Sequence, residues 1–155
     1  MTVHHFDISQ KSLGILRKNG WFSKRSVDTS ACKIAWQSEG FASFKYALYF
    51  VSAFGGLKII HESHSRNGED VSVFDPVKAT QRVGSAWVKE VYQPRINENI
   101  LPVGIGDSEH LTYYMGERGG VYGGFDGFFC KIGETVGDAF ENIFFNHQYI
   151  TLKLA

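Results

Sequence analysis

The sequence predicts an α+β fold in which helices pack on one antiparallel sheet. Apolar residues recur with the spacing of a helix in residues 47–54 and again in residues 136–144. Between these stripes, residues 101–132 contain short apolar stretches punctuated by glycine, which is typical of an antiparallel meander. Helices and strands that occur in separate runs favour an α+β architecture. A chain of 155 residues fits a single domain spanning 1–155, because two domains would each be marginal in size.

The first third of the chain is predicted to be helical. Ser9 is a good N-cap for a first helix, which stops at Asn19-Gly20. Asp28 offers a cap for a second short helix, which Gly40 closes. On one side of this second helix we expect three apolar residues, namely Ala31, Ile34 and Ala35.

The third helix has a clearer pattern, followed by a β-hairpin. Its apolar stripe, at positions i, i+3, i+4 and i+7, consists of Ala47, Phe50, Val51 and Phe54. Ser43 is the predicted cap, and Gly55-Gly56 breaks the helix. The hairpin strands are predicted at 57–62 and 71–74, and Asn67-Gly68 in their polar connection favours positive φ.

A middle helix is expected to open at Asp75-Pro76, because Asp caps a helix and Pro suits its first turn. The predicted apolar face of this helix consists of Val83, Ala86, Trp87 and Val91. Its end is expected near residues 92–94. We therefore predict one helix between the hairpin and the meander.

The last part of the chain is predicted to form the meander and a final helix. The meander strands are expected at 101–104, 111–115, 120–122 and 128–132, with turns at 107–109, 117–119 and 125–127. Thr135-x-x-Asp138 is a capping-box variant at the start of the final helix. The apolar stripe of that helix consists of Val136, Ala139, Phe140, Ile143 and Phe144.

Charge and composition narrow the classes of function. The sequence has 16 basic and 16 acidic residues, whereas nucleic-acid binders usually carry a basic excess that neutralises phosphates. No apolar run approaches the roughly 20 residues that span a bilayer, and the N-terminus lacks the features of a signal peptide. We expect a soluble, cytoplasmic protein that binds neither nucleic acid nor membrane. Cys32 and Cys130 lie far apart, which predicts two reduced, buried thiols.

Few residues of the sequence suggest a catalytic site or a binding site for a metal or cofactor. His61 and His64 are the best metal candidates, but residues three apart on a strand point to opposite faces, so we expect no metal and no cofactor. Gly106-Asp107-Ser108 with His110 resembles a serine-hydrolase fragment, yet one tight turn does not supply a nucleophile with a positioned base. The glycines between 104 and 127 match neither a Walker A loop nor a dinucleotide fingerprint. We expect no catalytic residues, and a hydrolase built on Ser108 and His110 is the least favoured alternative.

The order of several motifs resembles the third family of SUKH immunity proteins. The N-terminal motifs are Gly20-Trp21-Phe-Ser-Lys-Arg25-Ser-Val-Asp28, Gly40-Phe41 and Phe54-Gly55-Gly56-Leu57. The middle motif is Phe74-Asp75-Pro76 with Ala79. The C-terminal motifs are Leu101-Pro-Val-Gly104, Gly120-Val-Tyr122 with Phe125-Asp126, Ile132-Gly133 and Asp138-Ala139. Each motif is short, but their order and spacing together are specific and extend from about Ser9 to Phe144.

The resemblance implies the SUKH fold and a role as antidote in a bacterial polymorphic toxin system. Such proteins bind a toxin encoded beside them, often a nuclease or a nucleic-acid deaminase, and block it in the cytoplasm. Family members often have an acidic residue where this chain has Ile105, so the cognate toxin is expected to differ if that position contacts it. The Trp and Arg of the family correspond to Trp21 and Arg25. Each is a candidate toxin contact or, alternatively, a residue that packs and forms an internal hydrogen bond or ion pair.

The remaining toxin contacts are expected on loops, which tolerate variation. The candidates are His64, Arg66 and Glu69 in the hairpin, and Asp107, Glu109, Glu117 and Arg118 in the meander. The expected mechanism is occlusion of the active cleft of the toxin, with aromatic anchors and a charged rim. An intracellular scaffold or regulator is the alternative function, since the SUKH superfamily includes proteins with signalling and secretion-related roles. The oligomeric state stays open.

Overall fold

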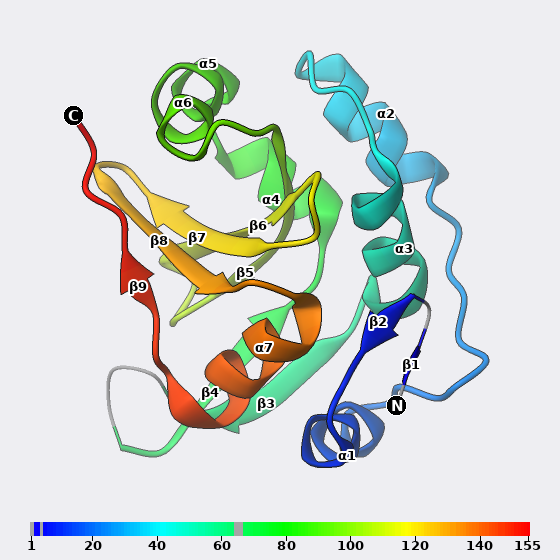
Figure 1. The fold of residues 1–155 in the computed structure, drawn as a ribbon. Coiled ribbons are helices and arrows are strands. Elements are labelled where there is room, and N and C mark those ends of the chain that lie inside the picture. Colours follow the sequence, from blue (N-terminus) through cyan, green and yellow to red (C-terminus); the bar gives the residue numbers. More distant parts are fainter. Residues whose placement is uncertain (1, 4, 64–66) are drawn as a thin grey trace.

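The computed structural model describes residues 2, 3, 5–63 and 67–155 (Figure 1). The helices are α1 (Gln10–Lys18), α2 (Ser30–Ser38), α3 (Lys45–Phe54), α4 (Pro76–Arg82), α5 (Ser85–Trp87), α6 (Gln93–Ile96) and α7 (Val136–Glu141), with π-helical segments η1 (Val88–Tyr92) and η2 (Asn142–Asn146). The strands are β1 (Thr2–Val3), β2 (Phe6–Asp7), β3 (Lys58–Glu62), β4 (Glu69–Val73), β5 (Ile100–Gly106), β6 (Leu111–Gly116), β7 (Val121–Phe125), β8 (Phe128–Gly133) and β9 (Ile150–Thr151). Within this described part of the chain, every helix is too short or too polar to cross a membrane.

Strands β3 to β9 form one antiparallel sheet in the order in which they occur along the chain. Strands β1 and β2 pair separately as a small hairpin that the sequence did not predict. In β5, the register against β6 shifts between Pro102 and Gly104, which marks a β-bulge. The predicted α+β fold, with a hairpin that precedes a meander, is confirmed.

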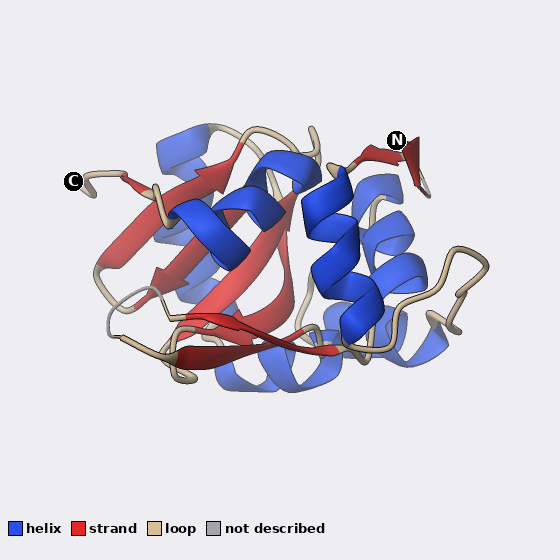
Figure 2. Cartoon of the chain, turned by 90° about the horizontal axis from the view of Figure 1, so that it is seen from below, coloured by secondary structure: helices blue, strands red, loops and turns tan. Residues whose placement is uncertain are grey.

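Helices cover both faces of the middle of the sheet. In Figures 1 and 2, α7 lies against one face and the segment from α4 to α6 lies against the other. All residues of β5 and β6 are buried, because other parts of the chain pack over both faces of these central strands. The cover on both sides explains why these strands do not alternate between apolar and polar residues.

Aromatic rings fill the space between the sheet and the pair α3 and α7. Phe140 lies at the centre of this cluster, with ring centroids 5.0 Å from Phe54, 5.7 Å from Phe74 and 5.1 Å from Phe144. Phe50 completes the cluster at 5.3 Å from Phe74. The predicted stripes of α3 and α7 are fully buried here, which confirms both of them.

Most of the predicted helix starts are also confirmed. Ser9 Oγ accepts a hydrogen bond from Ser12 N at 3.2 Å, and Thr135 Oγ1 accepts one from Asp138 N at 3.1 Å. Asp75 Oδ1 accepts one from the backbone N of Lys78 at 3.0 Å. These side-chain acceptors satisfy backbone donors that the first turn of a helix leaves unpaired.

Three predictions about α2 and α3 were wrong. The cap residue of α2 is Thr29 and not Asp28, although Asp28 Oδ1 accepts a hydrogen bond from Ser30 N at 2.9 Å. Helix α2 turns Cys32 and Trp36 inward, and Ile34 is 67% exposed, so the expected apolar side of Ala31, Ile34 and Ala35 faces away from the core. The indole Nε1 of Trp36 donates to the carbonyl of Pro102 at 2.9 Å, and this buried bond fixes the rotation of the helix. Helix α3 begins at Lys45 with Phe44 as its cap residue, so Ser43 is not the cap.

The single middle helix that the sequence predicted is interrupted. Helix α4 ends at Arg82, and Val83 and Gly84 adopt extended backbone conformations before α5 begins. The restart rotates the second part of the segment, so that its buried residues are Val88 and Tyr92. The predicted face of Val83, Ala86, Trp87 and Val91 is therefore wrong, and Trp87 is 45% exposed.

The two cysteines are free and buried, as expected. Burial raises the pKa of the Cys32 thiol to about 11 and that of Cys130 to about 12. Both thiols therefore stay protonated at neutral pH, and their role is to pack.

Candidate partner-binding site

The predicted contact residues of the meander lie at opposite ends of the sheet. Asp107 and Glu109 occupy the β5–β6 turn, whereas Glu117 and Arg118 occupy the β6–β7 turn. Successive turns of an antiparallel meander alternate between the two ends, so these pairs are separated by the length of β6. The structure therefore does not bring them together in one patch.

The β5–β6 turn is held against the start of β4. The carboxylate of Asp70 accepts two hydrogen bonds from the backbone N of Ser108, at 2.9 and 3.2 Å. This contact places the predicted residue Glu69, at the first position of β4, at the same end of the sheet as Asp107 and Glu109. Glu109 extends outward and pairs with Lys78 at 3.6 Å, with both side chains largely exposed.

The β6–β7 turn is tied to the segment that enters β5. Glu117 accepts a hydrogen bond from the backbone N of Asn99 at 3.2 Å, and the guanidinium of Arg118 donates to the carbonyl of Asn97. Beneath them, Glu98 accepts from the backbone N of Arg118 and from the hydroxyl of Tyr122, at 3.2 and 2.9 Å. Both predicted residues thus have structural contacts within the chain.

Trp21 and Arg25 also have structural contacts. Trp21 is 3% exposed, and the guanidinium of Arg17 lies 5.7 Å from its ring. Arg25 donates to the carbonyls of Ala53 and Gly55, at 3.1 and 2.7 Å, and so binds the C-terminal end of α3. These contacts match the alternative of packing and internal hydrogen bonds, and a toxin contact by either residue stays a prediction.

The remaining two predicted contacts, His64 and Arg66, lie outside the described residues. Of the suggested metal pair, His61 is described and His64 is not. Among the residues that are described, no three His, Cys, Asp or Glu side chains come together in a group that could hold a metal ion.

A Ser–His contact does occur, but not at the positions that the sequence suggested. His61 Nε2 lies 2.7 Å from Ser72 Oγ, which in turn lies 2.7 Å from the hydroxyl of Tyr113. Ser72 is fully buried, so its hydroxyl is closed to a substrate in this conformation. Ser108 and His110 lie instead in the β5–β6 turn, where residues 107–109 all have left-handed backbone angles. This geometry is that of a tight turn.

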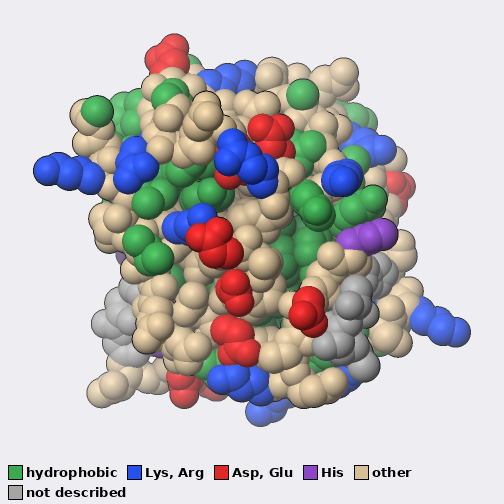
Figure 3. Space-filling view, in the orientation of Figure 1, with side chains coloured by type: hydrophobic (Ala, Val, Ile, Leu, Met, Phe, Trp, Pro, Cys, Tyr) green, Lys and Arg blue, Asp and Glu red, His purple; other side chains and the backbone are tan. Residues whose placement is uncertain are grey.

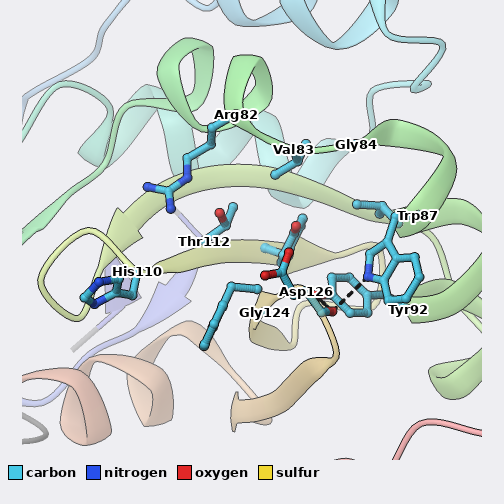
Figure 4. Close-up of a pocket in the computed structure, with 12 residues that line it drawn as sticks. Arg82, Val83, Gly84, Trp87, Tyr92, His110, Thr112, Gly124 and Asp126 are labelled. Atoms are coloured by element: carbon cyan, nitrogen blue, oxygen red, sulfur yellow. Dashed lines mark hydrogen bonds between the residues drawn. The ribbon is translucent and has the colours of Figure 1, made fainter.

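A cavity of about 490 Å³ opens on the α4–α6 side of the sheet (Figure 4). Its floor includes Thr112 and Tyr114 of β6 and Gly124 of β7. A Cβ atom at Gly124 would lie 2.8 Å from the ring of Tyr92, so glycine is needed for that ring to approach the sheet. The volume falls within the range of about 300–1,000 Å³ that is usual for ligand pockets.

The rim of this cavity combines aromatic and charged side chains. Figure 4 shows Arg82 and His110 at one end and Trp87 and Tyr92 at the other. Trp87 is 45% exposed and Phe125 is 48% exposed, although both are large apolar residues. Exposed aromatic residues next to a cavity are typical of binding surfaces.

The turn between β7 and β8 holds the aromatic end in place. The backbone carbonyl of Asp126 accepts hydrogen bonds from Trp87 Nε1 at 2.9 Å and from the hydroxyl of Tyr92 at 2.7 Å. Burial raises the pKa of Tyr92 above its ordinary value, so this hydroxyl remains a donor at neutral pH. The cavity wall is therefore formed before any partner arrives.

The main residues of this rim were not predicted from the sequence. Trp87 was assigned to a buried helix face, Phe125 was treated only as part of a turn, and Arg82 was not considered. One signal was available, because Gly84 interrupts an apolar pattern that would otherwise read as one helix. An interruption there changes which side of the following residues faces the sheet.

The opposite side of the molecule has a different character. Figure 3 shows acidic side chains gathered in the middle of one face, in the region that α7 occupies in Figure 1. Two of the acidic residues on or beside α7 are paired with lysines: Glu141 with Lys11 at 3.1 Å and Glu134 with Lys131 at 2.7 Å. These ion pairs reduce the charge that this face offers to a partner.

Comparison with known protein families gives a match that covers most of the chain. The family model described as SUKH-3 immunity protein matches residues 8–145. No curated protein and no solved structure matches the chain.

Proposed function

The chain belongs to the SUKH-3 immunity protein family, and we propose that it neutralises a cognate bacterial toxin domain by binding to it. The observation that carries this proposal is the extent of the family match, which covers residues 8–145 of 155 and so includes every strand from β3 to β8. The proposed target is a nuclease or nucleic-acid deaminase toxin, encoded by a gene next to the gene of this chain. The proposed place of action is the cytoplasm of the bacterium that produces both proteins.

The proposed mechanism is occlusion of the active cleft of the toxin, without a catalysed reaction. The balanced charge of the chain gives it little attraction for nucleic acid, so it would not compete with the toxin for substrate. Its buried Ser–His contact has no access to a substrate, whereas its exposed aromatic side chains surround an open cavity. These features support binding to a protein surface.

Co-expression tests the function directly. The C-terminal domain of the neighbouring toxin should stop the growth of a host cell, and co-expression of this chain should restore growth. The two proteins should also co-purify. Failure both to restore growth and to co-purify would contradict the proposal.

A titration separates occlusion from enzymatic inactivation. Toxin activity should fall in proportion to the amount of chain added and reach zero near one chain per toxin. Toxin recovered from the complex by denaturation and refolding should regain its activity. Inactivation by a small fraction of an equivalent, with a lasting loss of toxin activity, would show catalysis instead.

A further inference from the structure

The cavity beside Trp87 and Phe125 combines exposed aromatic rings with a cationic side chain. Trp87 is 45% exposed and bonds through its indole to the Asp126 carbonyl, and Phe125, which precedes Asp126 in the chain, is 48% exposed. The Phe125 ring is 6.0 Å from that of Phe128, and the Trp87 ring is 6.3 Å from that of Tyr92. Each exposed ring is thus held by contact with a second ring, and its outer side is open to a partner. Binding would therefore cost little side-chain entropy, because these rings are already ordered.

The positive charge of Arg82, at one end of the cavity, is not satisfied within the described residues. In the described residues, the guanidinium of Arg82 has neither an ion-pair partner nor a hydrogen-bond acceptor. Other charged side chains already have partners within the chain, such as Lys78 with Glu109 near the edge of the cavity and Lys11 with Glu141 beside α7. An approaching carboxylate would therefore find a free guanidinium at Arg82, which binds carboxylates with two parallel hydrogen bonds.

The aromatic end and the cationic end of the cavity together indicate which kind of partner segment it can bind. Arg82 and Trp87 flank the two ends of a cavity of about 490 Å³, whose volume exceeds that of a single side chain. The floor residues Thr112, Tyr114 and Gly124 are nearly buried and offer a closed surface. An aromatic or large aliphatic side chain would displace water from this floor, while an acidic neighbour would reach Arg82.

We propose that this cavity is the docking site for a loop of the toxin that carries a large apolar side chain next to an Asp or Glu. The apolar side chain occupies the space between Trp87 and Phe125, and the carboxylate pairs with Arg82. This inference rests on the proposed function and adds to it the binding face and the chemistry of the partner segment. The adjoining β5–β6 turn, with Glu109, lies at the edge of the same site through His110.

Two substitutions test the site at positions with few contacts inside the chain. Arg82→Glu reverses the unpaired charge, and Phe125→Ala removes one exposed ring. We expect each to weaken toxin binding by at least about 30-fold, since hot-spot truncations cost about 2 kcal/mol or more. Trp87 is not substituted, because its indole also holds the Asp126 turn.

Matched controls lie elsewhere on the surface. Lys33→Glu makes the same kind of charge reversal on α2, and Phe22→Ala removes a ring that is 59% exposed. Binding of both controls should stay within about threefold of the unsubstituted chain. A thermal melt of every variant checks that a loss of binding is not a loss of folding.

Crosslinking identifies the toxin segment that docks, and a charge swap tests its ion pair with Arg82. Benzoylphenylalanine placed at position 125 should crosslink, under light, to one toxin peptide that contains an Asp or Glu. Replacement of that acidic residue by Arg should weaken binding to the unsubstituted chain and restore binding to the Arg82→Glu variant. A crosslinked peptide without an acidic residue, or a swap that does not restore binding, would overturn the assignment of the carboxylate.

The outcomes separate the two proposals. If the unsubstituted chain binds and neutralises the toxin but Arg82→Glu and Phe125→Ala do so equally well, the docking site is wrong and the function stands. If the controls lose binding instead, the toxin docks on another face. If the unsubstituted chain does not bind the toxin, both proposals fail together.

Discussion

The two faces of the central sheet are filled to different extents. On the face of α3 and α7, the phenylalanine cluster around Phe140 closes the space, with ring centroids 5.0–5.7 Å from Phe54, Phe74 and Phe144. On the opposite face, the chain leaves its helix at Val83-Gly84, and a cavity of about 490 Å³ remains. A helix that is broken over a sheet cannot cover it as fully as one that is continuous.

If the proposed docking site is correct, this difference separates the residues that stabilise the fold from those that bind the toxin. The closed face buries large apolar area, which is the main source of folding free energy. The open face keeps Trp87 and Phe125 partly in water, which adds little to stability but leaves apolar surface for a partner. Substitutions on the two faces should therefore have opposite profiles, with stability lost on one and binding lost on the other.

The largest expected effect is on the closed face. Phe140→Ala should lower the free energy of unfolding by about 3–5 kcal/mol, because it leaves a cavity among four tightly packed rings. Urea denaturation measures this change, with Phe125→Ala as the matched substitution on the open face. An equal loss of stability for Phe140→Ala and Phe125→Ala would break the distinction between the two faces.

The next effect concerns the end of α3. Arg25→Ala removes two hydrogen bonds to the carbonyls of Ala53 and Gly55, and should cost about 1–3 kcal/mol of unfolding free energy. The affinity for toxin, measured well below the melting temperature, should stay the same. A large drop in affinity with little loss of stability would instead make Arg25 a toxin contact.

The closed face should also make stability depend on pH. His61 packs 5.7 Å from Phe144 and contacts Ser72, and its burial, the largest cause, lowers its pKa below the ordinary value of 6.5. Nearby charges act on it as well, with Asp70 and Glu62 raising the pKa and His147 lowering it. Below pH 6.5 the unfolded chain therefore takes up a proton that the folded chain does not, and stability falls as the pH falls.

Unfolding at several pH values between 7.5 and 5 measures this loss, and His61→Gln is the control. The variant lacks the titrating ring, so its stability should fall less steeply over the same interval. Parallel curves for the two proteins would exclude His61 as the source of the dependence.

The smallest expected effect on stability is on the open face. Arg82→Glu should change the free energy of unfolding by less than about 0.5 kcal/mol, which is the usual range for surface positions without special contacts. Thermal denaturation at low salt measures it. A loss of several kcal/mol would show that Arg82 stabilises the fold, and its effect on binding could not then be assigned to the cavity.

The sequence was sufficient for the parts of the fold that depend on local patterns. The stripes of α3 and α7 and the caps Ser9, Asp75 and Thr135 were predicted because periodicity and capping act within a few residues. The orientation of α2 was not, since it depends on the bond from Trp36 to Pro102, which are 66 residues apart. Such a long-range contact leaves no mark on the spacing of apolar residues.

The candidate site was predicted less well for a related reason. Loop position suggested Glu117 and Arg118, but the structure shows both bonded to the segment at 97–99. The cavity requires the break at Val83-Gly84, the glycine at 124 and the Asp126 turn to meet in space. Trp87 therefore looked like a buried helix residue, although the fold exposes its ring.

Hydrogen exchange of the chain, alone and with its toxin domain, tests most directly whether the open face binds the toxin. The proposed binding mode predicts slower exchange on complex formation in residues 82–88, 107–112 and 124–127, the segments that contain or adjoin residues lining the cavity. Residues of α7 and of the β6–β7 turn should exchange at the same rate in both states. Protection confined to α7 or to residues 117–120, with none around the cavity, would contradict it.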